Sequence, residues 1–434
     1  MNTMTFVAPL LAWQLCIAAA ASAGNWPGWR GPEGSGVSPE KDLPETWGTN
    51  RNVRWRAPLP GPNNSSPIVW SNRVFVAQAI KSQKRRAVLC FDRADGRQLW
   101  QAGVMYAEDE PTQERNPYCS ATPATDGERV VASFGSAGLY CYDFTGRQSW
   151  HRDFGRMNHP FGNASSPVLY SNLCVLNVGP DPKARLVAAD KRDGHTLWEV
   201  QPPRVEGAEV PPASGGPGAA EGGPVAGTWS TPLLIRTAQR DELVMAFPNC
   251  LAAYEPQTGK QLWLSTGIDD WIFTTPVSGE GVLVAMSSGA ARNPTLAVRP
   301  GGEGDGTMHR RLWRLERPKG QSIGSGVICD GCLYLIAEDG ALSCLELKTG
   351  NKVWEARLKG PGAKATSWSS ILLAGGRLYV PNQSGDVFVL RPGPKFDLLA
   401  TNSVHEPTNA SLAASEGDLF LRTDRALWCF TRAK

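Results

Sequence analysis

Residues Cys90–Trp100 read CFDRADGRQLW, and this pattern recurs along the chain. In each copy an acidic residue opens a turn, a glycine lies at its end, and a tryptophan follows four positions after the glycine. The five copies with this spacing end at Trp100, Trp150, Trp198, Trp263 and Trp354. Leu312-Trp313 ends a sixth copy, whose turn is displaced by an insertion. Such fixed spacing indicates a repeat architecture built from one supersecondary unit.

A second repeated element lies between the tryptophan units. It consists of Ser or Thr, then Pro, then two short apolar runs joined by a tight turn. Examples begin at Ser66-Pro67, Thr122-Pro123, Ser166-Pro167 and Thr275-Pro276. Turns such as Asp126-Gly127 and Asp330-Gly331 are typical of β-hairpins. Two apolar strands, a third that ends at the acidic residue and a fourth that carries the tryptophan would form one four-stranded antiparallel blade.

The number of repeats predicts the architecture. First strands start at positions 67, 123, 167, 232, 276, 326, 371 and 412, which gives eight blades. The last unit stops after its third strand, Ala426–Phe430, while Val53–Ala57 resembles an isolated fourth strand. Pairing these two segments would close the ring and remove its open sheet edges. We therefore predict an all-β, eight-bladed β-propeller closed by its N-terminal strand.

The repeated tryptophans and acidic residues are predicted to be structural. A large ring on each fourth strand can pack against the next blade, where its indole N–H needs a partner. The glycine permits the positive φ of the turn. Because adjacent blades need the same packing all around the ring, we predict no catalytic residue among these positions.

Composition excludes several classes of protein. Lys+Arg 44 against Asp+Glu 41 leaves a net charge of +3, and no long basic run indicates a nucleic-acid partner. Gly 46 and Pro 34 suit a turn-rich β protein better than a helical bundle, and only 5 His argue against a His-rich metalloenzyme.

The N-terminal residues resemble an export signal. An apolar stretch from Phe6 to Ala21 ends in the small-residue site Ala21-Ser22-Ala23. We predict a cleaved signal peptide over 1–23, a leader segment over 24–51, and the propeller over 52–434 with a flexible insertion loop over 202–227. The stretch has no preceding Lys or Arg, and an uncleaved anchor is the alternative. The mature chain is expected to be periplasmic or extracellular, with no membrane span.

The unit Asp-x-x-x-Gly-x-x-Leu-Trp resembles the tryptophan-docking repeat of the pyrroloquinoline-quinone (PQQ) propeller family, over about residues 52–431. The segment from Trp26 to Trp47 is similar to the leader of secreted members. The resemblance implies either a quinoprotein dehydrogenase with PQQ and calcium, or a cofactor-free propeller similar to the outer-membrane-assembly lipoprotein, which binds protein segments. The chain lacks the vicinal Cys-Cys of many alcohol-oxidising members, is shorter than they are, and offers no match to their calcium ligands.

Loops from each fourth strand to the next first strand would converge on one mouth of the channel. Their candidate binding residues are Arg115, Asn116, Tyr118, His159, Trp229, Asp269, Asp270, Trp271, Trp368, His405 and Glu406. Stacking rings with charged groups would suit a planar anion, a sugar or a peptide. The alternative interpretation is polar loop ends with tryptophans that plug the channel. We predict no metal site, because the histidines lack ligand spacing and Asp269-Asp270 has no assignable co-ligand.

Cys329 and Cys332 flank a hairpin turn rather than the start of a helix, so a thioredoxin-like role is not expected. An oxidised cross-hairpin pair and two core thiols both remain open.

Two functions follow from these observations. We favour an exported, non-enzymatic scaffold that binds a peptide, protein or glycan without a cofactor. The alternative is a small PQQ- and calcium-dependent oxidoreductase that acts on alcohols or sugars.

Overall fold

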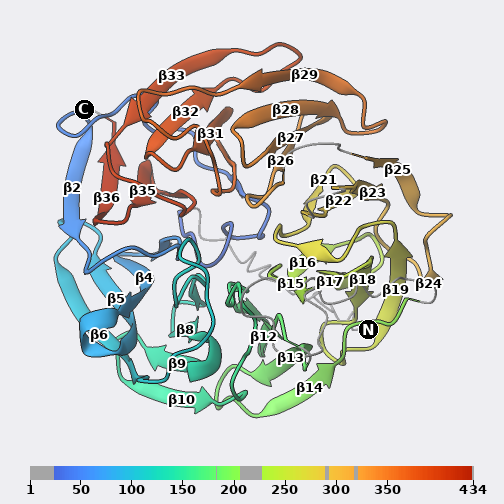
Figure 1. The fold of residues 1–434 in the computed structure, drawn as a ribbon, viewed down its shortest axis with the longest axis horizontal. Helices are drawn as coiled ribbons and strands as arrows, with labels where there is room; N and C mark the ends of the chain where they lie inside the picture. Colours follow the sequence, from blue (N-terminus) through green and yellow to red (C-terminus); the bar gives the residue numbers. More distant parts are fainter. Residues whose placement is uncertain (1–23, 182, 206–226, 289–292, 317–320, 433–434) are drawn as a thin grey trace, which may run out of the picture.

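The computed structural model describes residues 24–181, 183–205, 227–288, 293–316 and 321–432. The predicted signal peptide and positions 206–226 of the predicted insertion loop lie outside these residues. The described chain forms eight antiparallel blades around a central axis, which confirms the predicted propeller (Figure 1).

Each blade begins with a short inner strand and ends with an outer strand. Blades one to four contain β3 (Ile68–Trp70), β4 (Arg73–Ile80), β5 (Arg85–Asp92), β6 (Gln98–Met105); β7 (Ala124–Thr125), β8 (Arg129–Ser133), β9 (Leu139–Asp143), β10 (Gln148–Arg152); β11 (Val168–Tyr170), β12 (Leu173–Val178), β13 (Arg185–Asp190), β14 (Thr196–Val200); β16 (Leu233–Arg236), β17 (Asp241–Phe247), β18 (Cys250–Tyr254) and β19 (Gln261–Thr266).

Blades five to eight continue the same order. They contain β21 (Val277–Gly279), β22 (Val282–Met286), β23 (Thr295–Val298), β25 (Arg311–Leu315); β26 (Val327–Cys329), β27 (Cys332–Ile336), β28 (Ala341–Glu346), β29 (Lys352–Arg357); β30 (Leu372–Ala374), β31 (Arg377–Pro381), β32 (Asp386–Leu390), β33 (Leu398–Ser403); β34 (Ala413–Ser415), β35 (Asp418–Arg422), β36 (Ala426–Thr431) and β2 (Val53–Pro58). Each first strand starts one residue after its predicted position.

The remaining elements are short additions to this ring. They are β1 (Val37–Ser38), β15 (Gly227–Thr228), β20 (Trp271–Ile272), β24 (Gly304–Asp305), η1 (Lys81–Gln83) and η2 (Gly135–Ala137). No described helix is long and apolar enough to cross a membrane.

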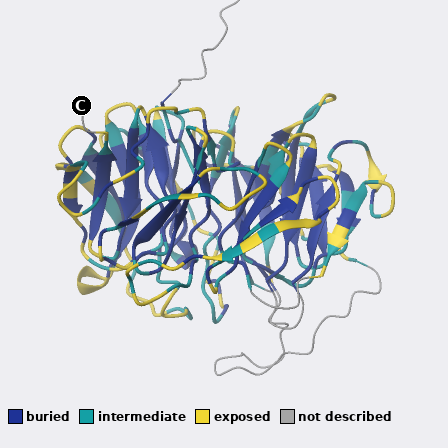
Figure 2. Ribbon diagram, turned by 90° about the horizontal axis from the view of Figure 1, so that it is seen from above, coloured by how far each residue is buried: buried dark blue, intermediate teal, exposed yellow. Residues whose placement is uncertain are grey.

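Burial explains why the strands have different sequence patterns. The second and third strands pack between neighbouring blades on both faces, so β12 (LCVLNV) and β32 (DVFVL) are buried throughout. The outer strand β2 (VRWRAP) buries alternate residues, because its other face meets solvent. Figure 2 shows the buried strands running through the thickness of the ring, with exposed turns on both faces.

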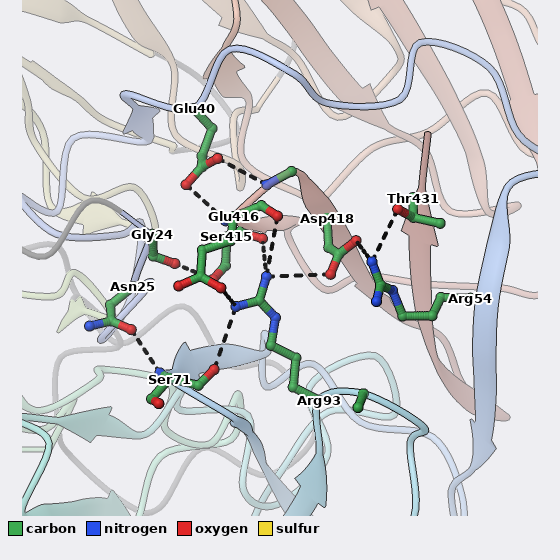
Figure 3. A network of polar contacts seen from close by, with 12 residues as sticks. Gly24, Asn25, Glu40, Arg54, Ser71, Arg93, Ser415, Glu416, Asp418 and Thr431 are labelled. Carbon is green, nitrogen blue, oxygen red and sulfur yellow. Dashed lines mark hydrogen bonds and ion pairs between the residues drawn. The ribbon is translucent and has the colours of Figure 1, made fainter. Parts of the chain in front are cut away.

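Closure of the ring follows the predicted register. β2 pairs antiparallel with β36, with Val53 opposite Phe430 and Pro58 opposite Ala426. A charged cluster reinforces this joint (Figure 3). Arg93 of blade one contacts Glu416 at 2.5 Å and Asp418 at 3.3 Å, and Arg54 contacts the other oxygen of Asp418 at 2.9 Å.

Most of the repeated tryptophans dock as predicted. Each indole N–H donates to a backbone carbonyl in the turn of the next blade, as Trp55 does to Arg93 at 2.7 Å and Trp198 to Pro256 at 2.9 Å. Trp100, Trp150, Trp313 and Trp354 do the same. Trp263 differs: it donates at 2.8 Å to the buried Glu242 carboxylate of its own blade, because the next blade carries the predicted insertion at its turn.

The leader crosses one face of the ring and fills a gap in the repeat at blade seven. Its strand β1 pairs parallel with β30 in blade seven. Blade seven has no docking tryptophan on β33, and the buried Trp47 lies there instead, stacked on Phe430 at 5.1 Å and near Tyr379 at 6.3 Å. The leader therefore supplies packing that the repeat lacks at this joint.

Candidate functional site

The hydroxyls of the Ser/Thr-Pro elements form a ring around the channel. Seven links join successive blades, each from the backbone N–H of the hydroxyl residue in one blade to the hydroxyl of the equivalent residue in the next blade, at 2.9–3.0 Å. The hydroxyl acceptors are Ser66, Thr122, Ser166, Thr231, Ser325, Ser370 and Ser411. At the remaining hydroxyl, Thr275, the donor is the indole N–H of Trp29 from the leader, at 2.9 Å. The ring holds the starts of the first strands together, and so fixes the loops just before them.

These loops surround a cavity of about 590 Å³ at one end of the channel. Trp29 forms part of its lining and also part of the lining of a second cavity, of about 670 Å³, on the leader side. Thr231 and Thr275 also line both cavities, so Trp29, bonded to Thr275, lies where the two cavities approach each other. The first cavity lies in the size range of small-molecule sites, roughly 300–1,000 Å³.

One wall of this cavity is aromatic. Strands β15 and β20 pair in parallel and bring Trp229 and Trp271 together, with centroids 5.8 Å apart and planes at 13°. Phe161 and Phe273 pack on these rings, and the buried His159 meets Trp229 edge-on at 4.9 Å. The Trp229 indole N–H donates to the Gly162 carbonyl at 2.9 Å, so its hydrogen-bonding capacity is already used within the protein.

The opposite wall carries the charged groups of the cavity. Arg115 lies 3.4 Å from Glu338, and its guanidinium carbon is 5.9 Å from the centroid of the Trp368 ring. The Trp368 indole N–H donates to the same Glu338 oxygen at 3.0 Å. The three side chains form one unit in which the two charges cancel.

Amide side chains complete the rim. They belong to Asn64, Gln113, Asn116, Gln321 and Asn409. The Asn64 amide donates to the Arg115 carbonyl at 2.8 Å, and the Asn116 amide donates to the Phe161 carbonyl at 2.7 Å. The oxygens of Asn64 and Asn116 can each accept a hydrogen bond, whereas the oxygen of Asn409 already accepts one from Gln383 at 2.6 Å.

A buried arginine supports the loop that carries Arg115. Arg86 is clamped between the rings of Tyr106 and Tyr118, at 4.3 and 4.4 Å from their centroids. It also pairs with Glu110 at 2.6 Å, and Glu110 belongs to the same loop. Tyr118, a predicted binding residue, is therefore part of the loop's support and does not line this cavity.

The structure brings five of the predicted residues into the cavity lining: Arg115, Asn116, Trp229, Trp271 and Trp368. His159 lies behind Trp229. Asp269, Asp270, His405 and Glu406 do not line the cavity. Burial raises the pKa of Asp270 above its ordinary value.

Glu406 lies at the ring closure, where β2 joins β36 within blade eight. Its carboxylate accepts hydrogen bonds from Arg56 at 2.8 Å, Thr423 at 2.6 Å and Trp428 at 3.0 Å. Burial acts to raise the pKa of Glu406, but these hydrogen bonds outweigh it and hold that pKa below its ordinary value.

Sequence reasoning missed Trp29, Glu338 and the framework role of the Ser/Thr hydroxyls. Trp29 comes from the leader, and Glu338 lies between the second and third strands of blade six rather than in a loop that joins blades. The framework role of the hydroxyls was visible in the sequence as a repeated pattern, since Ser or Thr starts every blade.

The residues of the cavity do not fit PQQ with calcium. Calcium takes six to eight oxygen ligands, with several carboxylates among them. Within the described ranges no group of three or more His, Cys, Asp or Glu side chains could hold a metal ion. Arg115 is the cavity's only cationic side chain in the described part of the chain and is already paired with Glu338, whereas PQQ is a tricarboxylate.

Cys329 and Cys332 face each other across the hairpin of β26 and β27, and both are free thiols. Burial raises the pKa of the Cys329 thiol to about 12, which disfavours a reactive thiolate.

Comparison with known proteins finds one matching family model and several solved structures of similar fold. The family model described as outer membrane protein assembly factor BamB matches residues 48–109, 84–299 and 251–420. The crystal structure of BamB from Moraxella catarrhalis superposes with a TM-score of 0.55 at 15% identity, covering 85% of this chain and 94% of that one. Quinohemoprotein alcohol dehydrogenase from Comamonas testosteroni gives a TM-score of 0.67 at 11% identity, covering 96% and 82%.

At these identities the structural likeness shows a shared fold alone. No curated protein sequence matches the chain.

Proposed function

Because the chain belongs to the family described as outer membrane protein assembly factor BamB, we propose that it is an exported, non-enzymatic propeller that binds a peptide, a protein segment or a glycan at its channel mouth. The fold is shared with quinoprotein dehydrogenases as well, so the fold does not choose between binding and catalysis. The choice depends on the cavity.

The observation that carries the proposal is the composition of that cavity. It combines an aromatic wall, an amide rim and a neutral Arg115–Glu338 pair. Apolar surfaces with a few convergent polar groups are typical of ligand sites. Among the described residues, the same lining has no carboxylate cluster for calcium and no unpaired cation to balance a tricarboxylate, which favours binding over quinone chemistry.

Export is supported by the apolar stretch from Phe6 to Ala21 and its Ala21-Ser22-Ala23 site. The family's description names an outer membrane assembly factor, which agrees with an exported protein. We propose that residues 1–23 are removed, that 24–51 form the leader and that 52–434 form the propeller.

The experiment compares the chain that starts at Gly24 with its Trp271→Ala variant. Trp271 is only partly buried, so the variant is expected to fold, and its melting temperature checks this directly. Thermal-shift screens against peptide and oligosaccharide collections should yield a ligand that stabilises the parent protein more than the variant.

A parallel assay mixes the parent protein with PQQ, Ca²⁺, an alcohol or sugar, and a redox dye. The proposal expects no dye reduction above a protein-free control. PQQ-dependent reduction that Trp271→Ala abolishes would overturn it in favour of the oxidoreductase.

A further inference from the structure

We infer that the ligand of the channel mouth is an uncharged carbohydrate, recognised by the ring of Trp271, which is stacked on the buried Trp229, together with the pair Arg115 and Glu338. This inference rests on the proposed binding function and names the chemical class of the ligand.

The charge balance of the cavity favours an uncharged ligand. Arg115 and Glu338 are its two charged residues among those described, and they lie 3.4 Å apart. An anion would have to compete with Glu338 for Arg115, and a cation would have to compete with Arg115 for Glu338. A neutral ligand with hydroxyl groups can use both, since Arg115 donates hydrogen bonds and Glu338 accepts them.

The aromatic wall requires a ligand with a flat apolar face. The Trp229 and Trp271 planes are nearly parallel, and Phe161 and Phe273 brace them. Trp229 is buried, and its N–H is bonded to the Gly162 carbonyl, so it supports the partly exposed Trp271, which offers the ligand its apolar ring surface. The C–H face of a sugar ring matches such a surface.

The amide rim requires many donors and acceptors on the ligand's other side. The amides of Asn64 and Asn116 each donate to a backbone carbonyl, but a purely apolar ligand would desolvate their oxygens without giving them a donor. A hydroxyl group both donates and accepts, so the edge of a sugar can satisfy such groups at successive positions.

The shape of the cavity disfavours an extended peptide. Peptides bind well along open sheet edges or long grooves, where their backbone groups find partners. Here the innermost strands enclose the channel, and Trp29 lies where this cavity approaches the one on the leader side. A cavity of about 590 Å³ with this form suits a short oligosaccharide or the end of a longer chain.

The experiment measures binding by calorimetry and tryptophan fluorescence, with neutral gluco- and N-acetylglucosamine trisaccharides as probes, an acidic trisaccharide that contains a uronic acid, and a pool of short peptides. We expect saturable binding of at least one neutral trisaccharide. Trp271→Ala should weaken it by about tenfold, in line with the loss of a buried stacking contact.

The variant Glu338→Gln distinguishes a neutral ligand from an anionic one. It retains an oxygen that can accept from Trp368 but removes the charged acceptor, so neutral sugar binding should weaken by about three- to tenfold. An anionic ligand would instead bind more tightly, because Arg115 would lose its partner. Phe396→Ala, on the outer rim beside Trp354, is the matched aromatic control and should leave binding unchanged.

Peptide binding that Trp271→Ala weakens, without sugar binding, would overturn the carbohydrate inference and leave the proposed function standing. Tighter binding of the acidic trisaccharide to Glu338→Gln, with no neutral sugar bound, would also overturn it. Dye reduction with PQQ would overturn the proposed function itself.

Discussion

At the scale of single residues, the turn glycine and the docking tryptophan act as a pair across two blades. Gly259 has a φ of +70°, and a Cβ there would lie 2.7 Å from the Trp198 ring of the preceding blade. The same relation holds between Gly96 and Trp55 at 2.6 Å. The glycine is therefore required by its neighbour's ring as well as by its own backbone conformation.

Substitution of Gly259 by alanine should be more costly than the same change at Gly281. Gly281 has a similar φ of +75° but no atom within 4 Å of a built Cβ, so Gly281→Ala reports the backbone strain alone, about 1–2 kcal/mol. Gly259→Ala should add about 1–3 kcal/mol from overpacking against Trp198. Urea unfolding of both variants measures the difference, and equal losses would show that the ring contact contributes nothing.

The lowered pKa of Glu406 predicts a pH-dependent contribution to the stability of the protein. Its pKa in the folded protein is below the ordinary 4.5, so the unfolded chain takes up its proton at a higher pH than the folded one. The stabilisation is therefore complete above about pH 4.5 and is lost as the pH falls through the folded-state pKa.

Glu406→Gln should cost about 1.5–3 kcal/mol at pH 7, the range for hydrogen bonds to charged groups. The difference in unfolding free energy between this variant and the parent protein should shrink as the pH drops from 6 towards 3, because the protonated carboxyl then resembles the amide. Unfolding curves across this range measure the gap, and one that does not change with pH would contradict the assignment.

At the scale of elements, the first strands are linked by the hydroxyl ring rather than by a continuous sheet. The N–H of Ser325 donates to Ser370 Oγ at 3.0 Å, and the N–H of Ser370 donates to Ser411 Oγ at 2.9 Å. These residues are buried, so each link satisfies a backbone group that water cannot reach.

Removal of one hydroxyl should destabilise the ring at that joint. Ser370→Ala leaves the Ser325 N–H without its acceptor, and we expect a loss of about 1–3 kcal/mol. Ser370→Thr is the matched control, since Thr serves the same purpose at Thr122 and Thr231, and it should retain most of the stability. Chemical denaturation of both variants measures the effect; an alanine variant as stable as the threonine variant would argue against the link.

At the scale of the whole molecule, the ring closure at blade eight differs from the way in which the other seven blades are built. Blade eight combines β34, β35 and β36 from the end of the chain with β2 from its start. The chain itself connects the other blades, whereas this ring closure depends on strand pairing, on Trp55 and on the Arg93 cluster. Arg93 is largely buried, with 10% of its side chain exposed, and it links blade one to Glu416 and Asp418 of blade eight.

Loss of Arg93 should loosen the closure before the rest of the ring. In Arg93→Met we expect the amides of β2 and β36 to exchange with deuterium about tenfold faster, while those of β17 and β18 on the far side keep their rates. Arg97→Met is the control, because Arg97 lies in the same turn with 67% of its side chain exposed. Equal exchange rates in the two variants would show that Arg93 does not stabilise the ring closure.

The sequence alone determined the blade count, the strand order and the ring closure, because each blade is built from neighbouring segments whose periodic pattern is visible without the fold. It also placed Arg115, Asn116, Trp229, Trp271 and Trp368 at one mouth, since the loops between blades share a face. Only the tertiary structure decided which residues complete the cavity. Trp29 reaches Thr275 across 246 positions, and Glu338 meets Arg115 and Trp368 from a different kind of turn. Such contacts follow from how separate segments pack in space, and no local periodicity records them.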